Sequence, residues 1–238
     1  MSDPGDPAGA DTPADQRDQT VPEVPAAAAR LFGAAVDDAA RYVSLLAGEG
    51  VLRGLIGPRE VPRLWDRHVL NSVALAEAVP AGARVVDVGS GAGLPGIPLG
   101  LARPDVTLTL VEPMARRVEF LQEVVADLGA PWRVVRGRAE ERSVVRAVGP
   151  VDVVTARAVA PLPRLVGWCR GLLAPGAQLI ALVGARAAAE VPDLVPELEA
   201  AGMRDVHIRA VGVELGAAAT TVVVMTRGGP ARSAPTSG

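Results

Sequence analysis

The sequence predicts an α/β fold in which a doubly wound, mostly parallel sheet follows an N-terminal helical cap. Three observations predict it. From residue 83 onward, short β-branched runs alternate with helical patterns. The first of these runs ends in a glycine-rich turn, and two consecutive strand patterns close the series. Such alternation is typical of right-handed crossovers and of a sheet that helices cover on both faces.

The helical cap is predicted from two stretches in which apolar residues recur at roughly helical spacing, 26–49 and 61–78, separated by a Gly-Pro break. Five strands of the parallel pattern are expected at 83–89, 107–112, 132–137, 151–157 and 178–184. The closing pair is expected at 204–211 and 219–227. Helices are expected at 96–102, 115–129, 162–173 and 187–202, with a short one after residue 137.

Composition divides the chain into four segments. Residues 1–25 are rich in Asp, Pro and Gly and hold six acidic side chains against Arg17, so we expect a disordered acidic tail. Residues 26–80 form the predicted cap and residues 81–227 the predicted sheet domain. Residues 228–238 resemble the first segment in composition and are expected to be a second disordered tail.

The charged residues limit how this chain can bind a partner. Every basic residue is arginine, and once the acidic tail is set aside the rest of the chain has a net charge of only +2. Bulk charge is therefore too small to hold a nucleic acid, and an RNA partner would depend on local arginine clusters.

Other classes of protein are excluded by composition. The single cysteine, Cys169, excludes an intramolecular disulfide and a multi-cysteine zinc site, so we expect no metal. No uncharged apolar run reaches about 18 residues, so we expect no membrane span. The N-terminus lacks the basic start and apolar stretch of a secretory signal, which favours a cytoplasmic location.

The most informative segment is the glycine-rich turn after the first strand. Residues 91–96 fit the dinucleotide pattern G-x-G-x-x-G, but the turn also places Asp87 before Gly89, Gly91 and Gly93. An acidic residue followed by spaced glycines resembles the first motif of methyltransferases. A pyrophosphate would be repelled by a carboxylate here, whereas S-adenosyl-L-methionine carries a sulfonium and an ammonium. Asp87 therefore favours S-adenosyl-L-methionine over a nicotinamide dinucleotide.

Two further carboxylates are candidates for binding the same cofactor. Glu112 ends the second strand, where a carboxylate can bind both ribose hydroxyls, although dinucleotide proteins also have an acidic residue there. Glu140 follows the third strand in Arg138-Ala139-Glu140, where methyltransferases commonly hold the edge of adenine. A solvated carboxylate in the first turn of a helix is an equally open interpretation of Glu140.

With these residues assembled, the chain resembles the RsmG (GidB) family of small-subunit (16S) ribosomal RNA guanine-N7 methyltransferases. The matching segments are WDRHVLNS at 65–72, DVGSGAGLPGIPL at 87–99, RRVEFL at 116–121 and ARAVA at 156–160. The resemblance covers most of residues 30–225. It implies a class I S-adenosylmethionine-dependent methyltransferase fold, Rossmann-like, whose last strand runs antiparallel. It also implies methyl transfer to N7 of a guanine within the small subunit or its precursor, by an enzyme expected to be a monomer.

The resemblance also implies roles for particular residues. The residues expected to contact the cofactor are Gly89, Leu94, Ala139, Glu140 and Arg157. Those expected around the RNA and the methyl-transfer pocket are Arg67, His68, Arg138 and Arg157. Family members often have a lysine beside the glycine after the fifth strand, where this chain has Val183, and Arg186 is a candidate replacement.

The chemistry of guanine N7 agrees with this set of residues. N7 carries an in-plane lone pair and no proton, so the reaction needs alignment and electrostatics rather than a general base. Arg157 ends a strand at the edge where α/β sheets bind ligands, and an ion pair with Glu140 or Asp87 is its structural alternative. Cys169 lies in an apolar helical stretch and is expected in the core rather than as a nucleophile.

Several side chains have a purely structural alternative. His68 is either functional or a helix-face histidine bonded within the cap, and Arg116 and Arg117 are expected on a solvated helix face. Among the tryptophans, we expect two in the core, Trp132 and Trp168, and one able to stack on a base, Trp65. N7 faces the deep major groove of A-form RNA, so the target base is expected in a loop or bulge, or flipped out.

Three other functions stay open from the sequence: a methyltransferase acting on a small molecule or a protein, a nucleotide-binding oxidoreductase, and a non-catalytic cofactor-binding assembly factor. Cofactor binding separates the oxidoreductase from the others. RNA-dependent methyl transfer separates the remaining two from an RNA methyltransferase.

Overall fold

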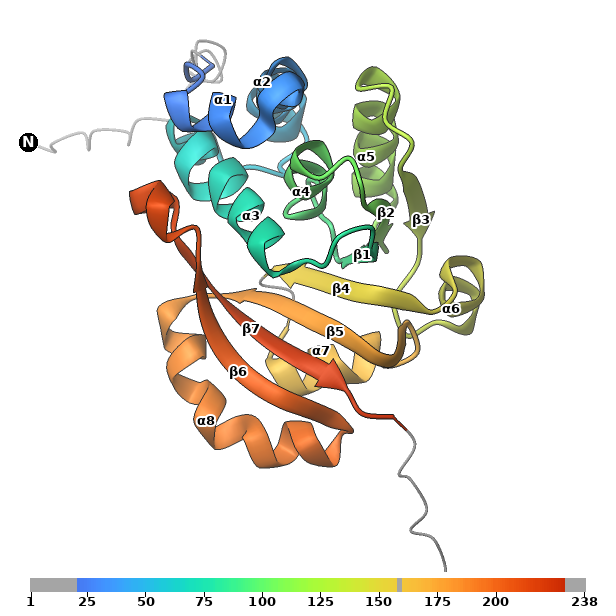
Figure 1. The fold of residues 1–238 in the computed structure, drawn as a ribbon. Helices are drawn as coiled ribbons and strands as arrows, with labels where there is room; N and C mark the ends of the chain where they lie inside the picture. The colour runs from blue at the N-terminus through green and yellow to red at the C-terminus, as the bar shows by residue number, and fades with distance from the viewer. Residues whose placement is uncertain (1–20, 158–159, 230–238) are drawn as a thin grey trace, which may run out of the picture.

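A computed structural model describes residues 21–157 and 160–229. Its centre is a seven-stranded sheet in the order β3-β2-β1-β4-β5-β7-β6 (Figure 1). The strands are β1 (Arg84–Val88), β2 (Thr107–Glu112), β3 (Arg133–Arg136), β4 (Val151–Arg157), β5 (Leu173–Val183), β6 (Met203–Val211) and β7 (Thr220–Arg227). The first five strands pair in parallel, and β7 runs antiparallel between β5 and β6. The predicted doubly wound sheet with an antiparallel last strand is confirmed.

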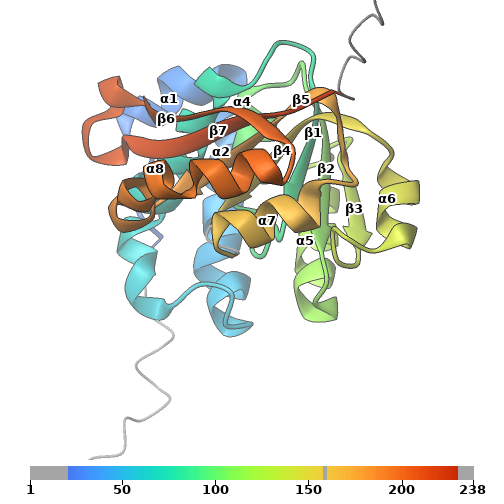
Figure 2. The same ribbon diagram turned by 90° about the horizontal axis from the view of Figure 1, so that it is seen from below.

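Helices cover both faces of this sheet (Figures 1 and 2). They are α4 (Gly96–Ala102), α5 (Ala115–Asp127), α6 (Arg142–Val148), α7 (Leu162–Cys169) and α8 (Ala185–Ala200). One hydrophobic cluster joins the cap, α4 and α5 to the first face, and another joins α6, α7 and α8 to the second. Successive β1 side chains point to opposite faces, so Val85 belongs to the first cluster and Val86 to the second.

The cap is more broken than the sequence predicted. Its regular helices are only α1 (Ala26–Phe32), α2 (Val36–Leu45) and α3 (Asn71–Val73). Short 3₁₀ and π-helical turns join them at Gly33–Ala35, Leu46–Gly50, Pro58–Arg63, Leu64–Leu70 and Ala74–Ala78. Gly33 adopts a φ of 52°, outside the right-handed helical range, and this ends α1. Both predicted stretches are therefore helical, but short turns divide each of them.

Two boundaries in the second half also differ from the prediction. Helix α7 ends at Cys169 rather than at residue 173, and β5 begins at Leu173 rather than at residue 178. Gly171 lies between them, and a Cβ there would come within 2.9 Å of Val145 on α6. The close approach of α6 gives a reason for the chain to leave the helix at this point and enter the sheet early.

Residues near both ends of the described chain make hydrogen bonds to the folded body. The carbonyl of Pro22 accepts a hydrogen bond from Trp65 Nε1 at 3.2 Å, and Gly228 N donates to Gly202 O at 2.8 Å. The predicted disorder of the two tails otherwise falls on residues 1–20 and 230–238, outside the described residues. Within residues 21–157 and 160–229, no helix combines the length and the apolar character needed to cross a bilayer.

Candidate active site

The glycine-rich turn connects β1 to α4 and is tied to the neighbouring strand. Gly89, Gly91 and Gly93 all have positive φ, at 69°, 59° and 98°, a backbone conformation that side chains with a Cβ rarely adopt. The N–H groups of Gly89 and Ser90 both donate to the carbonyl of Val111 at the end of β2, at 2.8 and 3.2 Å. The turn is thus held at the carboxyl edge of the sheet, where α/β folds bind ligands.

Asp87 supports this turn from below. Its side chain is fully buried, Oδ2 accepts from Gly96 N at 3.2 Å, and Oδ1 accepts from Thr155 Oγ1 at 3.0 Å. Burial raises the pKa of Asp87 to about 6 against these hydrogen bonds, which act to lower it. The carboxylate connects the turn to β4. It is not among the residues that line the nearby cavity. Its predicted contact with a cofactor stays a prediction.

The tight packing of Gly96 against Asp87 makes a direct prediction. A Cβ at Gly96 would lie 2.6 Å from Leu110 Cδ2 and 2.9 Å from Asp87 Oδ2. Gly96→Ala is therefore expected to lower the free energy of unfolding by about 1–3 kcal/mol through overpacking. Urea denaturation measures this change. Gly184→Ala is the matched control, because nothing lies within 4 Å of a Cβ there, and equal stability of the two variants would contradict the prediction.

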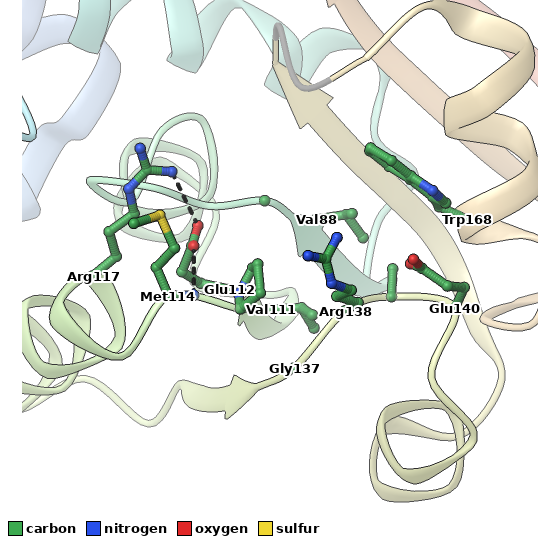
Figure 3. A pocket seen from close by; sticks show the side chains of 12 residues that line it. Val88, Val111, Glu112, Met114, Arg117, Gly137, Arg138, Glu140 and Trp168 are labelled. Atoms are coloured by element: carbon green, nitrogen blue, oxygen red, sulfur yellow. Dashed lines mark hydrogen bonds and ion pairs between the residues drawn. The ribbon is translucent and has the colours of Figure 1, made fainter.

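A cavity of about 180 Å³ opens at the carboxyl ends of β1, β2 and β3 (Figure 3). Its lining combines apolar walls with a few charged groups: Val88, Gly89, Val111, Glu112, Pro113, Met114, Arg117, Gly137, Arg138, Ala139, Glu140 and Trp168. The structure thus brings together five of the predicted residues, Gly89, Glu112, Arg138, Ala139 and Glu140. Leu94 is instead buried in the first hydrophobic cluster.

Glu112 is the polar anchor of this cavity. Its side chain is 1% exposed, yet Oε2 accepts from Gly91 N at 2.9 Å and Oε1 from Met114 N at 3.0 Å. Arg117 Nη1 lies 3.8 Å from Oε2 (Figure 3). Arg117 keeps 39% of its side chain exposed while its guanidinium reaches this buried carboxylate, and Arg116 is exposed as expected.

The hydrogen-bond acceptors and apolar walls of the cavity fit a nucleoside. Each oxygen of Glu112 accepts one backbone hydrogen bond, and a carboxylate oxygen can accept two, so capacity remains for a pair of hydroxyl groups. The apolar side chains of Val88, Val111 and Trp168 suit a flat ring. This combination of a buried acceptor and an apolar slot matches a ribose carrying a base.

A second polar group joins the cap to the end of β4. His68 Nε2 lies 2.8 Å from Glu60 Oε2, and His68 Nδ1 lies 3.4 Å from Arg157 Nη1. A guanidinium only donates, so Nδ1 accepts from Arg157 and Nε2 carries the proton that it donates to Glu60. Burial lowers the pKa of His68, which favours the neutral ring over the protonated one. Arg67 approaches Glu60 from the exposed side, with Nη1 3.4 Å from Oε1.

This arrangement answers the two alternatives left open by the sequence. Arg157 forms no ion pair with Glu140 or Asp87, since no described carboxylate lies within 4.0 Å of it, and its neighbour is His68 instead. His68 is bonded within the cap through Glu60 and also reaches the sheet through Arg157, and its part in the reaction stays a prediction.

Sequence reasoning missed two residues of this region. Glu60 orients His68, but nothing in the local sequence around it indicates a partner. Tyr42 is buried, and its hydroxyl donates to the carbonyl of Ala92 at 2.8 Å, which ties the cap to the glycine-rich turn. Burial raises the pKa of Tyr42 well above its usual value, so the phenol stays protonated as a donor.

The tryptophans correct one prediction. Trp65 is 4% exposed and packs edge-on against Phe32, with ring centroids 6.5 Å apart, so it cannot stack on a base and that prediction is wrong. Trp132 packs against the first hydrophobic cluster and Trp168 against the second, as predicted, and Trp168 also lines the cavity. Cys169 is confirmed as a core residue, because it is fully buried in the second hydrophobic cluster. This burial raises the pKa of its thiol to about 12.

The remaining predicted groups lie away from the cavity. Arg186 is on α8, where it pairs with Glu190 at 3.3 Å, and a phosphate contact there stays a prediction. In the part of the chain that the structure describes, no group of three or more His, Cys, Asp and Glu side chains is placed to hold a metal ion.

Sheet order, the antiparallel strand beside β5 and the cavity over Glu112 together define a Rossmann-like methyltransferase. Two solved structures share the fold. The fibrillarin pre-rRNA processing protein of Methanococcus jannaschii has a TM-score of 0.51 at 17% identity and covers 64% of this chain and 70% of its own. A methyltransferase from Pyrococcus furiosus has a TM-score of 0.51 at 14% identity over 66% and 80%. At these identities the likeness shows the fold alone.

Sequence comparison gives the family. The model of the GidB family, rRNA small subunit methyltransferase G, matches residues 35–216. The ribosomal RNA small subunit methyltransferase G of Mycolicibacterium gilvum is 52% identical over 204 residues, which cover 86% of this chain and 90% of the relative. That of Salinispora arenicola is 53% identical over 211 residues, 87% of each. The chain belongs to the GidB family and is a methyltransferase, as the sequence predicted.

Proposed function

We propose that this enzyme transfers a methyl group from S-adenosyl-L-methionine to N7 of a guanine in small-subunit ribosomal RNA. The observation that carries the proposal is the buried carboxylate of Glu112 in an apolar cavity beside the glycine-rich turn, in a chain of the GidB family. The substrate follows from the names of the relatives. A ribosomal substrate also implies action in the cytoplasm, and we expect a monomer.

The cavity residues divide the binding of the cofactor among themselves. Glu112 would accept from the ribose hydroxyls, and the segment Arg138-Ala139-Glu140 would hold the edge of the adenine between its backbone and Trp168. When bound, the cofactor supplies a methyl group on a positively charged sulfur. Asp87 lies beneath the turn and, once ionised, makes the potential there negative, which favours that positive charge.

The remaining residues need only align the base. Guanine N7 attacks through its own lone pair, and the neutral His68 has both ring nitrogens engaged, so it is not placed to remove a proton. Arg157 is the group best suited to the base, because guanidinium N–H groups bind the O6 edge of guanine. Binding at O6 would fix the ring plane, and alignment of reacting atoms supplies much of the rate enhancement in such reactions.

The raised pKa of Asp87 predicts a pH dependence of cofactor binding. The bound cation stabilises the ionised carboxylate, so affinity is full above the pKa of about 6 and falls below it. The decrease can reach at most about tenfold per pH unit. Calorimetry between about pH 5 and about pH 8 measures it. S-adenosylhomocysteine lacks the sulfonium and should show a shallower dependence, and identical profiles for the two ligands would contradict this role of Asp87.

The function itself is tested with small subunits purified from a strain that lacks this protein. Incubation with labelled S-adenosylmethionine is expected to label the small-subunit RNA, and borohydride–aniline cleavage should locate one N7-methylguanine. Calorimetry on the same preparation tests the cofactor. Binding of a nicotinamide dinucleotide in place of S-adenosylmethionine would indicate an oxidoreductase, and cofactor binding without methyl transfer would indicate an assembly factor.

A further inference from the structure

Half of the fourteen described arginines outside residues 133–170 face carboxylates. Seven of them lie within 4.0 Å of a carboxylate oxygen: Arg41, Arg53, Arg67, Arg84, Arg103, Arg117 and Arg186. These pairs neutralise seven charges that a partner could otherwise contact.

One side of the molecule departs from this pattern. None of the eight arginines in residues 133–170 has a carboxylate within 4.0 Å among the described residues. The seven that are exposed we call the arginine flank: Arg133, Arg136, Arg138, Arg142, Arg146, Arg164 and Arg170. The segment 133–170 holds eight arginines and three acidic residues, a net charge of +5, whereas residues 26–238 together carry only +2. The positive charge of the chain is concentrated here.

Contacts join the flank into one band. Arg133 lies on β3 and donates from Nη2 to the carbonyl of Ala147 on α6, the helix that carries Arg142 and Arg146 one turn apart. Arg170 precedes Gly171, whose Cα hydrogen faces Val145 on the same helix. Figures 1 and 2 show β3 and α6 together at one edge of the sheet, far from α8 and β6 at the other.

The band begins at the cavity. Arg138 lines the cavity together with Trp168 (Figure 3), and the Arg164 guanidinium lies 5.0 Å from the centre of the Trp168 ring. The cavity lies at the carboxyl ends of β1, β2 and β3, and Arg157 ends β4, which neighbours β1. RNA that presents a guanine to Arg157 could therefore continue past the cavity onto the flank. Two acidic residues interrupt the band, Glu140 at the cavity and Glu141 beside Gly137.

We propose that the arginine flank binds the phosphate backbone of the RNA next to the target guanine. The proposal rests on the proposed function. Like charges held close together without carboxylates repel one another, and an array of phosphates relieves this repulsion. The guanidinium fork also binds phosphate through two parallel hydrogen bonds. Such contacts fix the position of the RNA, while the choice of base is made at Arg157.

The test removes two charges of the flank that lie outside the cavity. Arg142→Gln/Arg146→Gln should raise KM for small subunits about tenfold and lower the slope of log affinity against log salt by about 1.4–1.8. The kcat and the affinity for S-adenosylmethionine should not change. Arg164→Gln/Arg170→Gln tests the same surface from α7 if the first variant fails to fold. The matched control is Arg41→Gln/Arg84→Gln, which removes the same charge from ion-paired positions.

The outcomes separate this proposal from the function on which it rests. If wild-type enzyme methylates small subunits and the flank variants match it in KM and salt slope, the flank proposal alone fails. If wild-type enzyme binds cofactor but neither binds nor methylates small subunits, the proposed function fails and the flank proposal with it. Loss of binding to phosphatidylserine vesicles, with subunit binding unchanged, would indicate a membrane surface and would also overturn the proposal.

Discussion

Arg157→Gln is expected to lower kcat for methyl transfer to small subunits by about a hundredfold to a thousandfold while the affinity for S-adenosylmethionine stays within a few-fold. The loss corresponds to removal of one preorganised donor in a site screened from water. Arg157 does not line the cavity, so cofactor binding should survive. Burial of this guanidinium costs desolvation energy, which also lowers the pKa of Arg157. The fold should therefore remain stable when the charge is removed.

Glu60→Gln separates the positioning of Arg157 from its direct contact with the base. An amide can donate to or accept from His68 Nε2, so the tautomer that leaves Nδ1 free to accept from Arg157 is no longer fixed. We expect a decrease in kcat of about tenfold, smaller than that of Arg157→Gln and with KM little changed. The variant should also depend on pH differently, because Glu60 is the strongest influence that raises the pKa of His68.

Arg63→Gln is the control for both variants, since Arg63 lies in the same short turn as Glu60 but is exposed. Its effect on kcat should stay within about threefold, as expected for an exposed surface charge. Thermal unfolding checks that each variant folds. Full activity of Arg157→Gln on small subunits would remove Arg157 from the mechanism.

The sheet was predictable because its sequence signal is local. Strands of a parallel sheet are buried on both faces, so each appears in the sequence as a short apolar run. The spaced glycines of the turn indicate backbone with positive φ angles. The cap was not predictable in the same detail. Helical periodicity cannot distinguish an α-helix from the 3₁₀ and π turns that occupy Pro58–Arg63 and Leu64–Leu70.

Part of the site was predictable from the order of strands. Glu112 ends β2 and Glu140 follows β3, so the topology alone brings both to the carboxyl edge of the sheet. Contacts between distant segments cannot be predicted from the local sequence. His68 and Arg157 are 89 residues apart in the chain, and Glu60 belongs to the site only because it contacts His68. Trp65 and Trp168 differ in exposure because of what packs around each, and neither neighbourhood can be read from the adjacent residues.

Glu112→Ala is expected to weaken binding of S-adenosylmethionine at least about a hundredfold, close to 3 kcal/mol, because hydrogen bonds to a charged acceptor each contribute about 1.5–3 kcal/mol. Part of the loss arises before any ligand arrives. The variant leaves the N–H groups of Gly91 and Met114 without their acceptor, so the turn loses its anchor to the cavity floor. Stability should therefore fall together with affinity.

Glu112→Gln distinguishes the two contributions. The glutamine oxygen can still accept from one backbone N–H, but its amide nitrogen would face the other N–H, donor against donor. We expect affinity nearly as low as in Glu112→Ala, with a smaller decrease in melting temperature. Glu119→Ala on the exposed side of α5 removes the same charge and should leave both quantities unchanged. Wild-type affinity in Glu112→Ala, measured by calorimetry, would show that the cofactor binds elsewhere, because no other buried carboxylate lines the cavity that the structure describes.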